Sequence, residues 1–372
     1  MDSQPTYLPR AQLQTLIDGL LTAGYQVLGP MLEQDVIQYR PLDSTSQLPR
    51  GVHDHQAPGS YRTTTTDSTR QFAWANGPQA LKPLLFAPTE PLWRVERDAD
   101  GALRFITAVP EAAPTAVIGV RACDLAALRL QDRHFLEGEH PDPYYRARRD
   151  NLLLVAVDCS HPADTCFCAS TGDGPDCDDS ADIVLTELAD GFLLWSYSAR
   201  GRAITEPLAL AKASADQVQN GKASIAAAAA TQPRRLPAAD LPTTLFANQA
   251  HPHWDDVAKR CLACGNCTLV CPSCFCHRSE ETPALGGASS EHSRVWDSCF
   301  TSGHAHLHST HLRETSRDQY RQWLTHKFGG WVEQYGRSGC TGCGRCISWC
   351  PVGIDVTAEL AALCAEAAGG NA

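Results

Sequence analysis

Cysteine is the residue type whose number and spacing point to chemistry in this chain. The 372 residues contain 17 cysteines but only two methionines. Eight of the cysteines form two runs of equal spacing, Cys261-x₂-Cys264-x₂-Cys267-x₃-Cys271-Pro272 and Cys340-x₂-Cys343-x₂-Cys346-x₃-Cys350-Pro351. Two-residue gaps let three thiolates of one loop surround one iron–sulfur cubane, and the three-residue step carries the fourth cysteine onto a helix that leaves the site. The repeated run predicts two 4Fe–4S clusters.

The fourth cysteine of each run decides how the ligands are shared. In two-cluster ferredoxins it binds the other cluster. We therefore expect one cluster on Cys261, Cys264, Cys267 and Cys350, and the other on Cys340, Cys343, Cys346 and Cys271. Structural zinc is the alternative, but zinc sites usually pair two Cys-x₂-Cys knuckles, which a doubled four-cysteine run ending in proline fits poorly. We also expect Gly265, Gly342 and Gly344 to relieve crowding where the backbone approaches a cluster.

A second set of cysteines lies in the first half of the chain, at Cys123, Cys159, Cys166 and Cys168. The segments 116–120 and 152–157 are short apolar runs typical of buried strands, and the segment from Leu125 to Phe135 between them is typical of a helix capped by Asp124. Such a βαβ unit brings the carboxyl ends of its two parallel strands to one edge of the sheet. The four thiols would then converge and could bind a third 4Fe–4S cluster. Buried thiols that act as small hydrophobic residues are the alternative.

Five cysteines remain outside these sets. Cys274, Cys276 and Cys299 lie in the insertion between the two runs, where packing is the favoured interpretation and a further centre with a non-cysteine ligand is the alternative. We assign no function to Cys177 and Cys364, which are isolated in the sequence.

Two other polar segments are candidates for sites. The histidine-rich segment 304–311 (HAHLHSTH) is interpreted as a solvated surface, because two of its histidine pairs are two residues apart and diverge on a helix, although His304 and His308 are four residues apart. A basic stretch contains Arg313, Arg317, Arg321 and Lys327. It is either a solvated helix face or compensation for cluster charge, and both interpretations are kept.

The elements that position these residues can be read from hydrophobic periodicity. The segment 9–23 is typical of a helix, and 27–29 and 36–39 of short strands. Residues 43–70 are rich in Ser, Thr, Pro and Gly and are expected to form a surface loop. The segments 183–188 and 192–195 predict a hairpin, and 205–231 predicts a helix.

The proline-rich stretch 233–252 is the best candidate for a domain boundary. We expect a mixed α/β domain over residues 1–235, which contains the βαβ unit and the third cysteine set. Residues 236–372 are expected to form a mostly helical domain around a two-cluster, ferredoxin-like core, with an insertion at 272–339. The fold class is therefore α+β or α/β.

Composition excludes several function classes. The formal net charge is −11, which is the wrong sign for a general nucleic-acid or anionic-membrane binder. Apolar runs such as 151–157 and 225–230 are too short to span a bilayer, and the N-terminal sequence MDSQPTYLPR has no secretory signal pattern, so we expect a cytoplasmic protein. Dinucleotide and P-loop motifs are absent from the sequence, so no nucleotide or flavin is expected on this chain.

The motifs together resemble a known family. CLACGNCTLVCPSCFC (261–276), VWDSC (295–299), HKF (326–328) and CTGCGRCISWCP (340–351) are similar to the dicluster iron–sulfur subunit of soluble NiFe hydrogenases, the sulfhydrogenase β-subunit type, which is related to the iron–sulfur subunit of anaerobic sulfite reductase. PGSYR (58–62), GVRACDLAAL (119–128), YYRARRD (144–150) and DCSHPADTCFC (158–168) extend the similarity into the first half of the chain.

The resemblance implies a non-catalytic electron-transfer subunit. Its expected partners are either the small and large subunits of a NiFe hydrogenase or the catalytic subunit of a sulfite reductase, together with an FAD/NAD(P)-binding diaphorase subunit. Two other function classes are alternatives. A stand-alone iron–sulfur enzyme would use an incompletely ligated cluster at Cys274, Cys276 and Cys299, and a zinc-bearing interaction module is opposed by the acidic composition.

Overall fold

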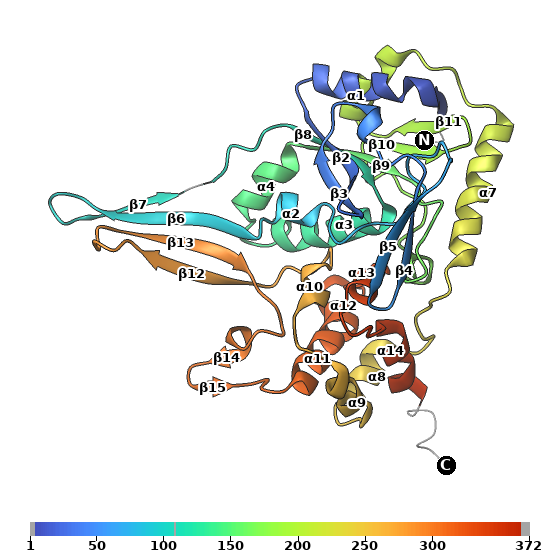
Figure 1. Ribbon diagram of the computed structural model, residues 1–372. Coiled ribbons are helices and arrows are strands. Elements are labelled where there is room, and N and C mark those ends of the chain that lie inside the picture. The colour runs from blue at the N-terminus through green and yellow to red at the C-terminus, as the bar shows by residue number, and fades with distance from the viewer. Residues whose placement is uncertain (1–3, 108, 366–372) are drawn as a thin grey trace.

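A seven-stranded mixed sheet organises the first half of the molecule. The computed structural model describes residues 4–107 and 109–365. The strand order is β1-β11-β10-β9-β8-β2-β3, in which β2, β8, β9 and β10 are parallel to one another and the strands at both edges are antiparallel (Figure 1). The strands span Thr6–Pro9 (β1), Gln26–Glu33 (β2), Val36–Pro41 (β3), Thr115–Val120 (β8), Leu152–Val157 (β9), Ile183–Glu187 (β10) and Gly191–Ser196 (β11).

Helices cover both faces of this sheet. One apolar cluster joins α1 and α6 to one face, and a second joins α2, α3 and α4 to the other. Strand β9 is buried at every residue, as expected for a parallel strand with both faces covered. The helices of this half span Leu13–Thr22 (α1), Lys82–Leu85 (α2), Ala122–Leu136 (α3), Pro143–Asp150 (α4), Cys168–Thr171 (α5), Ala199–Thr205 (α6) and Ala215–Thr231 (α7). The predicted βαβ unit, the hairpin β10–β11 and the mixed α/β class are confirmed.

Two sequence predictions about local structure were wrong in part. The segment expected as one helix over 205–231 is interrupted before Ala215, because Ala209 has a φ of 49° and Ser214 caps a new helix by accepting a hydrogen bond from the Gln217 amide. Residues 43–70 contain a hairpin of β4 (Val52–Ala57) and β5 (Ser60–Thr65). Its strands are polar because much of their surface faces solvent, so their composition is that of a loop.

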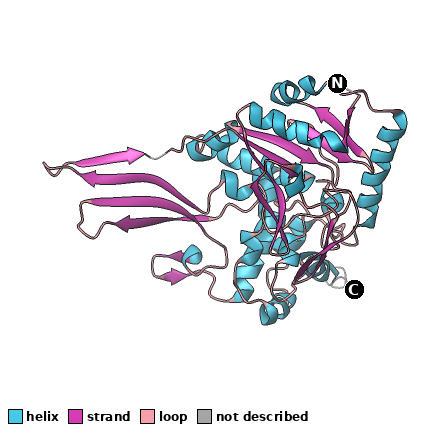
Figure 2. Ribbon diagram, turned by 45° about the horizontal axis from the view of Figure 1, so that its top comes forward, coloured by secondary structure: helices cyan, strands magenta, loops and turns pink. Residues whose placement is uncertain are grey.

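A second sheet projects from the body of the molecule as an arm (Figures 1 and 2). Its order is β12-β13-β6-β7, with antiparallel pairing throughout. The strands span Thr89–Arg97 (β6), Leu103–Thr107 (β7), His277–Pro283 (β12) and Ser289–Trp296 (β13). The insertion between the cysteine runs therefore pairs with a segment from the first third of the chain.

The last third of the chain is mainly helical, as predicted. Its helices surround an apolar cluster that includes Trp254, Trp323 and Leu360. They span Leu241–Ala247 (α8), His253–Arg260 (α9), Asn266–Leu269 (α10), Ser316–Thr325 (α11), Trp331–Tyr335 (α12), Arg345–Ser348 (α13) and Val356–Ala365 (α14), with a π-helical turn at His326–Gly330 and two short strands at His306–Leu307 (β14) and Thr310–His311 (β15). No helix in the described part of the chain is long and apolar enough to cross a membrane.

Candidate metal centres

Four cysteines of the first predicted set line one cavity. Cys261 follows the last residue of α9, Cys264 and Cys267 flank the start of α10, and Cys350 approaches from the end of α13. The cavity has a volume of about 30 Å³, and its other walls include Phe300, Tyr320 and Trp323. Cys264 is exposed, so this cavity lies next to the molecular surface.

Backbone amides point at sulfur atoms of this set. The Ala263 amide donates to Cys261 Sγ over 3.4 Å, and the Ile354 amide donates to Cys350 Sγ over 3.3 Å. Such N–H···S contacts stabilise thiolate ligands and are a regular feature of iron–sulfur sites.

The second predicted set lines an adjacent cavity of about 20 Å³. Cys340, Cys343 and Cys346 meet Cys271 there, with Lys327 beside them. The Gly342 amide donates to Cys340 Sγ over 3.4 Å. The structure thus places the fourth cysteine of each run beside the first three cysteines of the other run. Cys346 lines both cavities, so the two sets are immediate neighbours.

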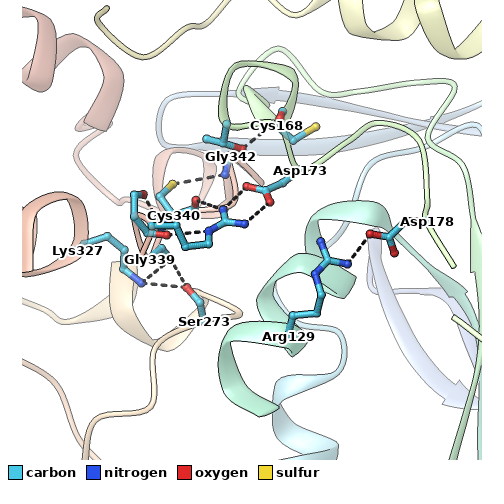
Figure 3. A network of polar contacts seen from close by, with 12 residues as sticks. Arg129, Cys168, Asp173, Asp178, Ser273, Lys327, Gly339, Cys340 and Gly342 are labelled. Carbon is cyan, nitrogen blue, oxygen red and sulfur yellow. Dashed lines mark hydrogen bonds and ion pairs between the residues drawn. The ribbon is translucent and has the colours of Figure 1, made fainter. Parts of the chain in front are cut away.

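Lys327 supplies a buried positive charge to the second set (Figure 3). Its Nζ donates to Ser273 Oγ over 3.0 Å and to the Gly339 carbonyl over 3.3 Å. It also donates to Cys271 Sγ over 3.3 Å. Burial alone would lower the pKa of Lys327, but the neighbouring sulfur groups of Cys271 and Cys274 outweigh it and hold the pKa above its ordinary value. Lys327 is therefore the member of the predicted basic stretch that compensates for thiolate charge.

Two other members of that stretch form ordinary ion pairs. Arg317 pairs with Asp255 over 2.8 Å, and Arg321 pairs with Asp318 over 2.9 Å. All of these side chains are at least a quarter exposed, which fits the solvated-face interpretation.

The third predicted set also converges on one cavity. Cys123 lies in the first turn of α3, directly after β8, while Cys159 follows β9 by two residues. Cys166 and Cys168 reach the same cavity, which has a volume of about 20 Å³. Cys343 of the second set lines it too. The sheet therefore brings its two strand ends together as the βαβ argument predicted, and it does so beside the second cysteine set.

The chemistry of the third cavity suits thiolate ligands. Gln232 donates its side-chain amide to Cys168 Sγ over 3.2 Å, and the Asn76 side-chain amide lies 3.9 Å from Cys123 Sγ. Burial raises the pKa of Cys168 to about 12. A thiol in this position keeps its proton until a metal replaces it, which is the usual coupling between metal binding and proton release.

A buried arginine fixes one wall of this cavity. Arg121 donates to the carbonyls of Phe72 and Trp74, each over 2.8 Å, and to that of Asp158 over 3.1 Å. It therefore fastens the loop before α2 to the end of β9. Its positive charge also opposes the effect of burial on the pKa of Cys159.

A second buried arginine, Arg345, joins the two halves of the molecule. It lies between two cysteines of the second run and donates to Asp124 Oδ1 over 2.8 Å and Oδ2 over 3.0 Å, and both side chains are 1% exposed. The prediction that Asp124 caps α3 was wrong, because Arg121 occupies the N-cap position. A carboxylate near a helix start is the usual sequence signal of a cap, and the arginine that pairs with this one lies 221 residues away.

The glycines of the second run allow a close approach between loops. A Cβ at Gly342 would lie 2.5 Å from the Cys168 amide nitrogen, and one at Gly344 would lie 2.4 Å from the Thr165 carbonyl oxygen. Gly342 has a φ of 64° and Gly344 a φ of 72°. At these two glycines the close neighbours belong to the 165–168 loop, and the expectation that they make room for a cluster stays a prediction.

An ion pair ties the same part of the chain to the second run (Figure 3). Arg337 donates to both carboxylate oxygens of Asp173, over 2.7 and 2.6 Å, and also to the carbonyl of Cys340. The Phe167 amide donates to the Gly342 carbonyl over 2.8 Å. The second and third cavities are therefore held in a fixed relation by backbone and side-chain contacts.

The β4–β5 hairpin is a part of the site that the sequence reasoning missed. Its turn residue Gly59 donates to the Ile347 carbonyl over 3.0 Å, Tyr61 stacks on Trp349, and Ser348 donates to Gln56 Oε1 over 2.6 Å. The hairpin thus covers α13, which carries Cys346. Its signal was present in the PGSYR motif, which the family resemblance includes.

The remaining cysteines fall into two groups. Cys276 and Cys299 lie with their sulfur atoms 3.9 Å apart at the base of the β12–β13 hairpin, whereas the Cys274 thiol is hydrogen bonded to Cys271. Cys177 packs against the core under α3, and Cys364 packs against the helical core. These contacts are ordinary packing, and no function is assigned to Cys177 or Cys364.

The histidine-rich segment is largely solvated, as predicted. His306, His308 and His311 are exposed, but His304 is half-buried and lies 3.4 Å from Asp297.

Comparisons with known proteins identify a cluster-binding domain and a similar protein. Residues 260–354 match the 4Fe-4S dicluster domain family, and this range contains all eight cysteines of the two runs. The chain is 28% identical over 281 residues to sulfhydrogenase 2 subunit beta of Pyrococcus furiosus, an alignment that covers 74% of this chain and 79% of the relative. No solved structure matches the chain significantly. The resemblance to the sulfhydrogenase β-subunit type is therefore confirmed, and the chain is an iron–sulfur protein with a 4Fe–4S dicluster domain.

Proposed function

We propose that this chain is the electron-transfer subunit of a cytoplasmic hydrogenase complex and that it binds three 4Fe–4S clusters. The observation that carries the proposal is the sharing of walls between neighbouring cavities. Cys346 lines the first and second, and Cys343 lines the second and third. Adjacent one-electron centres supply the chemistry of a relay.

The ligand assignment follows the cavities. Cys261, Cys264, Cys267 and Cys350 would hold one cluster, and Cys340, Cys343, Cys346 and Cys271 the second. Cys123, Cys159, Cys166 and Cys168 would hold the third. Each set offers four thiolates and leaves no open iron position, which favours electron transfer over substrate binding.

The chain's own residues set the order of the sites. The second set lies between the other two, because it shares a wall with each. The first set lies near the surface at Cys264, beside exposed Leu262 and Val352. An apolar surface next to a shallow site suits a partner that must come close for electron transfer. We infer that one redox partner docks on this side.

The name of the Pyrococcus furiosus relative favours hydrogenase partners. We propose that a NiFe hydrogenase small and large subunit pair binds at one end of the relay, and that the other end meets an FAD/NAD(P)-binding diaphorase subunit. The exposed site at Cys264 and the buried third site then serve different partners.

Iron and acid-labile sulfide per chain, measured on anaerobically purified protein, test the proposal. We expect about twelve irons per chain for three cubanes, against about eight for two. Cys166→Ser should remove iron from the third site alone, and Cys264→Ala from the first, while Cys364→Ser serves as the control. A wild-type content near eight irons that Cys166→Ser leaves unchanged would rule out the third cluster.

The relay role is tested in the assembled complex. Cys264→Ala should abolish NAD(P)-coupled turnover while the catalytic partner keeps its activity with artificial dyes. Coupled turnover that survives this change would contradict the relay. Dye-linked turnover by the isolated chain would favour a stand-alone enzyme.

A further inference from the structure

The base of the β12–β13 hairpin gathers ligand groups that the three cluster sites do not use. Cys276 directly precedes β12, and Cys299 follows β13 by three residues. The Asp297 amide donates to the Cys276 carbonyl over 2.9 Å, so the two ends of the hairpin are fixed beside each other. His304 approaches from the turn that follows, and ligand atoms of the two cysteines and this histidine all lie within 4.8 Å of one another.

We propose that Cys276, Cys299 and His304 bind a single zinc ion. The distance between the two sulfur atoms carries the argument. Two thiolates on one tetrahedral zinc, each about 2.3 Å from the metal, have their sulfur atoms about 3.8 Å apart. The observed separation is 3.9 Å.

The same distance excludes a cubane on this cysteine pair. Thiolates of a 4Fe–4S cluster bind different irons and stand about 6 Å apart. The sulfurs are also much farther apart than the roughly 2.0 Å of a disulfide bond. The sequence-based alternative of an incompletely ligated cluster on these residues is therefore not supported by the geometry.

Asp297 positions the histidine ligand. Its carboxylate oxygen Oδ2 has no hydrogen-bond partner among the described residues and lies 3.4 Å from His304 Nδ1, in a side chain that is 1% exposed. A carboxylate that accepts from one imidazole nitrogen directs the other toward a metal, as is usual at zinc sites. A hydrogen bond from His304 Nδ1 to this free carboxylate oxygen, formed when the metal binds, would leave Nε2 of His304 for the ion.

The charges around the site are compatible with a divalent cation. Asp297 and the two thiolates supply three negative charges, and Arg278 lies 3.9 Å from the Asp297 carboxylate. The two positive charges of a zinc ion and the one of the Arg278 guanidinium balance these three negative charges. Two sulfur ligands and one imidazole are the donor types that zinc prefers, and three protein ligands leave the fourth position for water.

The ion would hold together three segments of the insertion. It joins the start of β12, the residues after β13 and the turn that carries His304. The arm that β12 and β13 form with β6 and β7 is thereby fastened at its base, close to the second cysteine set. This inference does not depend on the proposed relay, because zinc has no redox chemistry here.

Metal analysis of the full-length chain, purified without oxygen, tests the proposal. We expect about one zinc per chain beside the iron, and an X-ray absorption spectrum at the zinc edge with two sulfur neighbours near 2.3 Å and nitrogen or oxygen neighbours near about 2.0 Å. Cys299→Ser should reduce zinc at least tenfold and leave iron and sulfide unchanged. Cys364→Ser is the matched cysteine control and should keep both metals.

A second variant keeps the test decisive if Cys299→Ser does not fold. The His304 side chain is 28% exposed, so His304→Ala should be tolerated, and it should weaken zinc retention against a chelator at least tenfold. His311→Ala, at an exposed position in the same segment, is its control. Absence of zinc from fully iron-loaded protein, a shell of four sulfurs around zinc, or a Cys276–Cys299 disulfide found by mass spectrometry would each overturn the proposal.

Discussion

Replacing Lys327 with methionine should lower the reduction potential of the proposed second cluster. Methionine approximates the length of the lysine side chain but removes its positive charge. The Nζ atom of Lys327 lies 3.3 Å from Cys271 Sγ and is buried, so water cannot replace its effect. The reduced cluster carries one more negative charge than the oxidised cluster and loses more stabilisation when the lysine is removed.

The size of the shift follows from Coulomb's law. The centre of a cubane lies about 3 to 4 Å beyond a ligand sulfur, which places it about 6.5 Å from Nζ. At an effective dielectric constant near 20, one unit charge at that distance contributes about 2.5 kcal/mol. For a one-electron couple this energy corresponds to about 100 mV, since about 59 mV is a tenfold change in the equilibrium constant. The potential should therefore become about 100 mV more negative.

Redox titration followed by EPR, on anaerobically purified protein with equal iron content, measures the shift. Lys327→Arg keeps the charge and should leave the potential nearly unchanged. Lys82→Met is a matched control, because Lys82 is equally buried but donates to the carbonyls of Thr268, Leu269 and Cys271, and burial lowers its pKa. It should shift the potential less than Lys327→Met does, because Lys82 contacts the Cys271 carbonyl and not a ligand sulfur. A shift below about 20 mV in Lys327→Met, or one confined to the first cluster, would refute the electrostatic reasoning.

Buried contacts lead to three further predictions. Asp124→Asn should destabilise the protein by about 3–5 kcal/mol, because it leaves the Arg345 charge unpaired. In a chain of this length, that loss lowers the melting temperature by about 4–6 °C. Adding Arg345→Met to this variant should restore much of the lost stability, and additive losses in the double variant would contradict this reasoning. Gly342→Ala should lower the free energy of unfolding by about 2 kcal/mol or more and reduce the iron bound at the third site. Gly336 has a similar φ, but an added Cβ there meets nothing within 4 Å, so Gly336→Ala should retain iron. Equal iron loss in both variants would refute the clash argument. Burial lowers the pKa of His134 from 6.5 to about 4. Between these pH values the unfolded chain binds a proton at this residue that the folded chain does not bind. The stability present above pH 6.5 should therefore fall as the pH drops toward 4. The melting temperature of His134→Gln should fall less over this range than that of the wild type, and parallel curves would exclude His134 as the cause.

Local signals were sufficient for much of the fold. The strands β8 and β9 and the helix between them were predicted because short apolar runs separated by a periodic segment have few alternative structures. The cysteine spacing predicted a dicluster domain because the ligand loops of such clusters are short and continuous in sequence.

Contacts between distant segments could not be predicted in this way. The β4–β5 hairpin contains polar strands whose order comes from packing on α13, so composition alone suggested a loop. Asp124 occupies a place where a helix cap is common, and only the folded chain brings Arg345 to it. The approach of Cys276 to Cys299 depends on the pairing of β12 with β13, and the exposed, polar residues of β12 gave no strand pattern.

The position of the third cysteine set explains why an α/β sheet accompanies the dicluster domain. Parallel strands place their carboxyl ends at one edge, and here that edge presents Cys123 and Cys159. Gly342 and Gly344 let the second cysteine run press against the 165–168 loop at the same edge, and the buried Arg345 pair locks this contact. Larger residues at these glycines would separate the second and third cavities, which share Cys343 as a wall. The rate of electron transfer falls steeply with the distance between centres. Such a separation should therefore slow a relay even if every cysteine kept its ligand role. In the proposed relay, the sheet would act as a rigid support for the third centre, and the close packing of its edge on the dicluster loops would keep that centre near the second.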